Sequence, residues 1–151
     1  MTTTNEKNIA TFLHLSALTQ YIIPFGNYIF PIVIWSSKKN ESEFVDQNGK
    51  QVLNFQLSIF LYMVVLCLIA IPIFIYSIFK NVPMNDIDFD RHYVIENLSA
   101  GNITGITILG IIAVLLFFFL KVIEFILIIY AAVKASNGEA YKYPLSIPFF
   151  K

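Results

Sequence analysis

The sequence predicts an all-α membrane protein, a small polytopic helical bundle with two long transmembrane helices and a short N-terminal helical hairpin. Three observations lead to this fold class. Of the 151 residues, 57% are hydrophobic and only 13% are charged, far from the balance of a soluble globular domain. The apolar residues gather in three long stretches, 9–35, 52–79 and 103–133. A cluster of turn residues interrupts the first stretch.

The first stretch, residues 9–35, contains the turn sequence Pro24-Phe25-Gly26-Asn27. Proline fixes φ, glycine tolerates positive φ, and asparagine can bond its own backbone, so this tetrapeptide favours a turn. The arms on either side, residues 9–23 and 28–35, are shorter than the roughly 20 residues that cross a hydrocarbon core. A hairpin is therefore expected, and a single kinked span is the alternative.

The second and third stretches, residues 52–79 and 103–133, are each long enough to span a bilayer. Because lipid offers no partner to backbone polar groups, both are expected to be helices. An acidic segment, residues 80–102, joins them, and residues 134–151 form a tail. We expect residues 1–151 to form a single integral membrane domain.

Basic residues predict the orientation of this domain. Residues 36–50 and residues 134–151 contain three lysines each, whereas residues 80–102 contain one Lys and one Arg against four acidic residues. The positive-inside rule then places residues 36–50 and the C-terminus in the cytoplasm. The acidic segment is expected on the opposite side of a bacterial inner membrane.

Several blocks of the sequence resemble a known family. They are His14 to Leu18, Pro31 to Trp35 with Lys38 and Lys39, Phe44 to Gln56 with Ser58, and Ala132 to Leu145. Over nearly its whole length the chain resembles the small bacterial membrane proteins called DUF-forty-eight-seventy, which are considered similar to Tic-twenty, a four-helix component of the chloroplast inner-envelope import machinery. This resemblance implies a multi-pass inner-membrane protein with no established enzymatic role. It also favours the hairpin, because four apolar segments are the family expectation.

Lys121 and Glu124 fall near the middle of residues 103–133, where an unpaired charge is costly. Their i, i+3 spacing places them on one helix face, so they can pair. We interpret them as a self-neutralised pair, or as the point where the helix leaves the bilayer. A contact with a partner subunit and a proton or ion relay are the functional alternatives.

Three other polar side chains lie among apolar residues: His14, Asn54 and Gln56. His14 is expected to pack against a neighbouring helix, with a pH-sensing or metal-binding role as the alternative. Asn54 and Gln56 open the second stretch, and Ser58 lies one turn beyond Asn54 on the same face. They are either amides solvated among the headgroups or the polar mouth of a pathway or docking surface.

The tail offers Tyr141, Tyr143 and Pro144 as candidate docking residues. Two prolines prevent it from forming a continuous helix. It is expected to lie extended on the cytoplasmic headgroups, or to dock on residues 36–50 or on another protein.

Motifs of known catalytic and metal chemistry are missing from the sequence. There is no Gly-rich phosphate loop, no His-Glu-x-x-His and no Gly-x-Ser-x-Gly, and residues 86–90 fail the EF-hand pattern. We therefore expect no enzymatic activity, no cofactor and no metal. Ten basic residues balance ten acidic ones, so nucleic-acid binding is not expected.

The predicted function is that of a non-catalytic inner-membrane subunit. It would act through lipids and through other membrane subunits or copies of itself, as an accessory or channel-like element of protein translocation or envelope assembly. A small homo-oligomeric ion or solute transporter is the alternative, with His14, Asn54, Lys121 and Glu124 lining a polar route.

Overall fold

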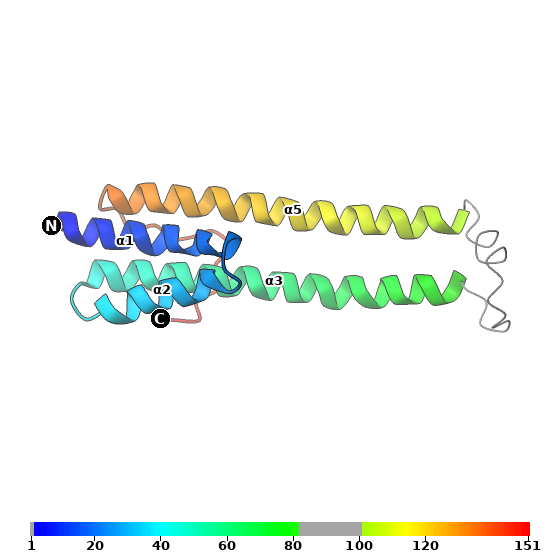
Figure 1. Cartoon of the computed structure of the whole chain (residues 1–151), viewed down its shortest axis with the longest axis horizontal. Coiled ribbons are helices and arrows are strands. Elements are labelled where there is room, and N and C mark those ends of the chain that lie inside the picture. The colour runs from blue at the N-terminus through cyan, green and yellow to red at the C-terminus, as the bar shows by residue number, and fades with distance from the viewer. Residues whose placement is uncertain (1, 82–100) are drawn as a thin grey trace. The chain divides into compact units, whose positions relative to one another are not determined.

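The structure, a computed structural model, describes residues 2–81 and 101–151, and in these ranges it contains helices, turns and an extended tail but no strand (Figure 1). The elements are α1 (Thr4–Ser16), the short 3-10 helix η1 (Ala17–Tyr21), α2 (Gly26–Lys38), α3 (Glu43–Asn81) and α5 (Gly101–Ser136). The predicted all-α fold class is confirmed. Most of the predicted acidic segment, residues 82–100, lies outside the described residues.

The N-terminal hairpin consists of α1, η1 and α2. Thr3 caps α1 through a capping box, in which its side chain accepts from the Glu6 N–H and the Glu6 carboxylate accepts from the Thr3 N–H. The left-handed residue of the turn is Phe25, with φ of 62°, rather than the expected glycine. Gly26 already begins α2, where a Cβ would lie 2.6 Å from Thr19 Oγ1. The hairpin is thus confirmed, and glycine serves close packing there.

Two helical stretches are long and apolar enough to cross a membrane, Glu43–Tyr76 within α3 and Ile108–Ser136 within α5. α3 has 39 residues and α5 has 36. At about 1.5 Å per residue, each helix is much longer than a hydrocarbon core of roughly 30 Å, so part of each lies outside the hydrocarbon. α3 begins well before its apolar stretch, because polar residues such as the paired Asp46 and Lys50 continue the helix there.

The chain divides into two compact units. Unit 1 comprises Met1–Tyr62 and Leu120–Lys151, and unit 2 comprises Met63–Phe119. Unit 1 therefore holds the hairpin, the first part of α3, the last part of α5 and the tail. Its buried apolar core is made by Leu13, Ala17, Val45, Val52, Phe55, Ile59, Ile128, Ala131 and Tyr143.

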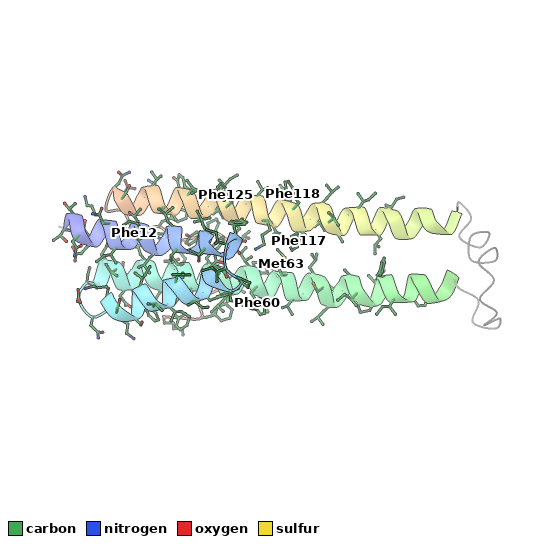
Figure 2. The ribbon with its side chains drawn as sticks, viewed as in Figure 1. Phe12, Phe60, Met63, Phe117, Phe118 and Phe125 are labelled. Atoms are coloured by element: carbon green, nitrogen blue, oxygen red, sulfur yellow. The ribbon has the colours of Figure 1, made fainter. Side chains whose placement is uncertain are left out.

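Unit 2 holds the apolar parts of α3 and α5. Phe117 and Phe118 project from neighbouring positions of α5 (Figure 2) and are 50% and 66% exposed. Because lipid is as apolar as these side chains, such exposure suits a helix surface in contact with a bilayer.

Candidate functional site

The polar side chains that the sequence singles out lie inside unit 1. A buried polar group is costly unless it is hydrogen-bonded, so the partners of each one define how the unit is built. The buried polar and charged side chains of the described residues are His14, Asn27, Asn48, Asn54, Gln56, Ser58 and Glu124. They fall into separate clusters that join different elements.

The first cluster is a closed ring of Gln20, Lys121 and Glu124. Lys121 Nζ donates to Glu124 Oε2 at 2.8 Å and to Gln20 Oε1 at 3.1 Å, while Gln20 Nε2 donates to Glu124 Oε1 at 2.9 Å. Both oxygens of the fully buried carboxylate therefore have a donor. The pairing expected from the i, i+3 spacing is present. Gln20 could not be predicted, because it comes from η1 and meets α5 only in the folded chain.

The second cluster surrounds His14, which joins α1 to α3 and to the tail. Its Nε2 lies 2.9 Å from Asn48 Oδ1, and its Nδ1 lies 2.8 Å from the Tyr143 hydroxyl. Asn48 Nδ2 donates to the Phe44 carbonyl, which leaves Asn48 Oδ1 as an acceptor. His14 Nε2 therefore carries the proton, and Nδ1 accepts from Tyr143.

The protonation states in this cluster follow from burial. Burial lowers the pKa of His14 to about 4, so the ring is neutral at neutral pH. Burial likewise raises the pKa of Tyr143 well above its usual range, so its hydroxyl stays a donor. Both ring nitrogens of His14 are taken by side chains of the same unit, which leaves neither nitrogen available to a metal ion.

The third cluster is a clasp in which Asn54 and Ser58 bind the tail. Asn54 Oδ1 accepts from the backbone N–H of Phe149 at 3.0 Å and of Phe150 at 2.8 Å, and its Nδ2 donates to the Phe150 carbonyl at 2.9 Å. Ser58 Oγ accepts from the Ile147 N–H at 2.7 Å and donates to the Asn54 carbonyl. The amide of Asn54 thus pairs with tail backbone much as a peptide group would.

The three predicted docking residues of the tail differ in how deeply they are buried. Tyr143 is buried and stacks on Phe55 with 4.1 Å between ring centroids. Tyr141 packs edge-on against both Tyr130 and Tyr143, whereas Pro144 is exposed. The contacts of the tail described here are made within the chain, and docking on another protein stays a prediction.

Gln56 is buried but incompletely bonded. Its Oε1 accepts from Asn27 Nδ2 at 2.7 Å, while its Nε2 has no hydrogen-bond partner among the described residues. Asn27 was expected only as a turn residue, although a polar side chain beside an apolar arm could have signalled a buried contact. A role of either residue in a pathway or a partner contact stays a prediction.

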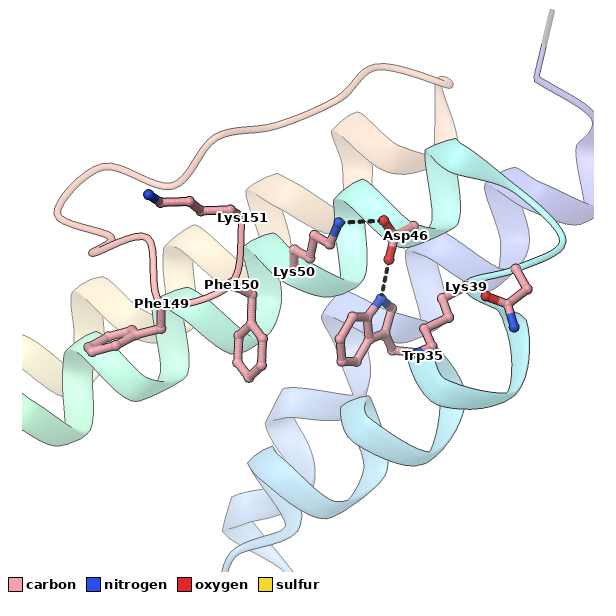
Figure 3. Close-up of a pocket in the computed structure, with 8 residues that line it drawn as sticks. Trp35, Lys39, Asp46, Lys50, Phe149, Phe150 and Lys151 are labelled. Carbon is pink, nitrogen blue, oxygen red and sulfur yellow. Dashed lines mark hydrogen bonds and ion pairs between the residues drawn. The ribbon is translucent and has the colours of Figure 1, made fainter.

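A basic pocket of about 450 Å³ lies where α2, α3 and the tail meet (Figure 3). It is lined by Trp35, Lys39, Asn40, Asp46, Lys50, Phe149, Phe150 and Lys151. Trp35 Nε1 donates to Asp46 Oδ1 at 2.8 Å, and Lys50 Nζ pairs with Asp46 Oδ2 at 2.7 Å. The sequence analysis did not predict this pocket, although Asp46 and Lys50 have the i, i+4 spacing of a helical ion pair.

Trp35 reaches its place in the basic pocket because Gly49 lies beside it. A Cβ on Gly49 would lie 2.2 Å from Trp35 Cδ1, far inside the contact distance of two non-bonded carbon atoms. Glycine is therefore required at this position for the indole to lie against α3.

Comparison with known proteins identifies a family. The model of the magnetosome magnetite crystal formation protein family matches residues 5–150. No curated protein matches, and no solved structure matches. The resemblance to DUF-forty-eight-seventy and Tic-twenty is corrected by this match. The blocks that carried it include His14, Asn48 and Asn54, which build the interior of unit 1 and therefore report on packing rather than on activity.

The predicted function is corrected by the same match. A role in protein translocation or envelope assembly was wrong, and so was the alternative of an ion or solute transporter, because the matched family acts in magnetite crystal formation. The prediction of a membrane protein with two long spans is retained.

Proposed function

Because the chain belongs to the magnetosome magnetite crystal formation protein family, we propose that it works in the magnetosome membrane and contributes there to the formation of magnetite crystals. The observation that carries this proposal is the family match, which covers residues 5–150. The two candidate spans support a membrane location. The magnetosome membrane is an invagination of the inner membrane, so the lysine-rich segments would keep their cytoplasmic orientation.

This orientation gives the acidic segment a specific place. With residues 36–50 and 134–151 in the cytoplasm, the segment that joins the two spans faces the magnetosome lumen. Its sequence contains Asp86, Asp88 and Asp90, which lie outside the described residues. The sequence pattern of residues 86–90 predicted no metal site. The family match changes this expectation, and because carboxylate oxygens are preferred ligands of hard cations, we propose that this segment contacts iron ions or the mineral surface.

Unit 1 is assigned a structural role. In the part of the chain that the structure describes, the side chains of His14, Asn54 and Glu124 are all hydrogen-bonded within the unit. Each of these side chains has a hydrogen bond to another element of the unit, which supports a structural role for the three side chains. We propose accordingly that the chain is not an enzyme and acts through lipids and through copies of itself or other membrane proteins.

The proposed function is tested in a magnetosome-forming cell that lacks this chain. Crystal size is measured by electron microscopy after complementation with the natural chain or with a variant carrying Asp86→Asn, Asp88→Asn and Asp90→Asn. A matched control carries Glu41→Gln, Glu43→Gln and Glu139→Gln, which remove the same charge from the cytoplasmic side.

We expect smaller crystals without the chain and with the triple aspartate variant, and natural crystals with the control. Natural crystals in the absence of the chain would overturn the proposed function. Natural crystals with the aspartate variant alone would overturn only the assignment of these carboxylates.

The orientation is tested separately by labelling of introduced cysteines. In a Cys67→Ser background, a cysteine at Thr3 or at Asn40 should react with a membrane-impermeant reagent only from the cytoplasmic side. Reaction of either residue from the opposite side would refute the orientation and leave the family assignment intact.

A further inference from the structure

The basic pocket lies where two elements pass from apolar to basic sequence. In α2 the apolar residues end at Trp35 and are followed by Lys38 and Lys39. In α3, Lys50 lies two residues before the apolar stretch that begins at Val52. A helix that spans a bilayer makes this change of composition at the depth of the lipid headgroups, where tryptophan is also enriched.

The charges of the pocket are unbalanced. Lys39, Lys50 and Lys151 line it together with a single acidic side chain, Asp46. The Asp46 carboxylate is already bound by Lys50 at 2.7 Å and by the Trp35 indole at 2.8 Å. Among the described residues, no carboxylate lies within ion-pair distance of Lys39 or Lys151. The ammonium groups of Lys39 and Lys151 therefore have no carboxylate partner among the described residues.

The positions of these groups are supported by aromatic side chains. Lys39 Nζ lies 4.9 Å from the centroid of the Trp35 ring, and Phe150 packs edge-on against the same ring at 5.6 Å. The clasp of Asn54 holds the backbone of Phe149 and Phe150, which brings Lys151 to the pocket. Phe149 and Phe150 are 49% and 39% exposed, so they present an apolar rim beside the lysines.

We propose that the basic pocket binds the phosphate group of an anionic phospholipid, with Lys39, Lys50 and Lys151 around the phosphate and Phe149 and Phe150 beside the first part of the acyl chains. The pocket volume of about 450 Å³ is within the range of small-molecule sites. A soluble phosphate compound offers the same chemistry without acyl chains. The exposed apolar rim and the adjoining span favour the lipid.

Trp35 is the single tryptophan of the chain and therefore reports on this pocket alone. The purified full chain is placed in nanodiscs of phosphatidylcholine that contain a small fraction of lipid brominated on the acyl chain, because bromine quenches tryptophan fluorescence at short range. The brominated lipid is phosphatidylglycerol in one sample and phosphatidylcholine in the other, at the same mole fraction.

The natural chain should be quenched more by brominated phosphatidylglycerol than by brominated phosphatidylcholine. A lysine near an anionic headgroup enriches it by about fivefold, so two free lysines predict a clear excess of quenching. The Lys39→Gln, Lys151→Gln variant should lose this excess. The control Lys7→Gln, Lys134→Gln, which changes the net charge equally but leaves the pocket intact, should keep it.

A second arm distinguishes the source of the phosphate. Inorganic phosphate is added to the natural chain and to the pocket variant in nanodiscs of phosphatidylcholine alone. A lipid site predicts excess quenching by brominated phosphatidylglycerol and little change with inorganic phosphate. The alternative result is that inorganic phosphate changes the Trp35 fluorescence of the natural chain but not of the variant, while the two brominated lipids quench equally. This result would support a phosphate site and reject the lipid.

The proposal is overturned if Trp35 shows neither excess quenching by brominated phosphatidylglycerol nor a fluorescence change with inorganic phosphate. It is also overturned if the pocket variant and the control show the same excess quenching. Both lysines of the pocket variant are exposed, so their replacement should leave the fold unchanged. An unchanged Trp35 emission maximum in phosphatidylcholine verifies this. If the emission maximum of the variant shifts, the natural chain alone decides the test. The proposal is then rejected if the two brominated lipids quench Trp35 of the natural chain equally and inorganic phosphate does not change its fluorescence.

Discussion

Unit 1 and unit 2 share the helices α3 and α5 but are built in different ways. In unit 1, polar side chains are buried and connect elements that are far apart in sequence, as in the ring of Gln20, Lys121 and Glu124. In unit 2, the described side chains are almost all apolar and many are exposed; Leu68 and Val114 are each 67% exposed.

This difference reflects the two solvents of a membrane protein. Apolar side chains gain little from packing together when lipid surrounds them, so hydrogen bonds and close contacts must specify which helices meet. Unit 1 contains such directional contacts, and unit 2 supplies apolar surface for the bilayer. Breaking a polar contact of unit 1 should therefore cost far more than trimming an apolar side chain of unit 2.

The largest effect is expected for Lys121→Leu. The substitution leaves the Glu124 carboxylate buried without its cation, which should lower the free energy of unfolding by about 3–5 kcal/mol. Thermal unfolding in detergent micelles, followed by Trp35 fluorescence, measures this loss. The double variant Lys121→Leu, Glu124→Leu removes both charges and should be clearly more stable than the single one. Equal stability of the single variant and the natural chain would contradict the role of the ring.

The Asn54→Ala variant should release the end of the tail. It removes the three hydrogen bonds to Phe149 and Phe150, each worth about 1 kcal/mol. Hydrogen exchange of these two amides should then accelerate by roughly 100-fold. Gln51→Ala, one turn earlier on α3, is the control and should leave their exchange unchanged. Slow exchange in the Asn54 variant would show that the clasp does not hold the tail.

His14 should make the stability of unit 1 depend on pH. Burial lowers its pKa from 6.5 to about 4, so between these values the unfolded chain binds more protons than the folded chain. The contribution of neutral His14 to the stability of the folded chain is complete above pH 6.5. It is lost as the pH falls toward 4, because the unfolded chain gains a proton on this residue. Between pH 7 and pH 5 the free energy of unfolding should fall by about 2 kcal/mol. Thermal unfolding at both pH values measures this loss of stability. If a His14→Gln variant lost as much free energy of unfolding between pH 7 and pH 5, the assignment of the pH dependence to His14 would be refuted.

The smallest effect is expected in unit 2. Val114→Ala trims a side chain that is 67% exposed and should change the free energy of unfolding by less than about 0.5 kcal/mol. The same substitution at Val52, which is 1% exposed in unit 1, should cost roughly 2 kcal/mol. Comparable losses at the two positions, measured by thermal unfolding, would remove the distinction between the units.

Hydropathy and turn chemistry were sufficient to predict that the helices exist, but not where each one begins and ends. Long apolar stretches require helices in lipid, and Pro24 to Asn27 predicted the hairpin, because these properties are local. The start of α3 at Glu43 was not predicted, since hydropathy locates the part of a helix in the hydrocarbon and not its extension into water.

The contacts inside unit 1 could be predicted only where they are local. The pairing of Lys121 with Glu124 follows from helix periodicity. The bond of His14 to Tyr143 joins residues 129 positions apart, and no spacing rule predicts such a contact. The basic pocket depends in addition on Gly49, whose importance emerges only when Trp35 lies against it. The family came from comparison with known proteins, and the proposed function rests on that family.

The clasp also determines when the chain can finish folding. Residues 147–150 leave the ribosome after every helix of the unit, yet Asn54 and Ser58 bind them. Until residues 147–150 are synthesised, Asn54 and Ser58 lack their hydrogen bonds to the tail. His14 likewise lacks Tyr143 until that residue is synthesised, although Asn48 is already present. Folding of unit 1 is therefore completed late, after membrane insertion, because contacts of α1 and α3 require the tail that follows the last helix. A nascent chain halted before residue 143 would hold its two spans in the bilayer while the polar side chains of its N-terminal half remained open to the quality-control proteases of the cell.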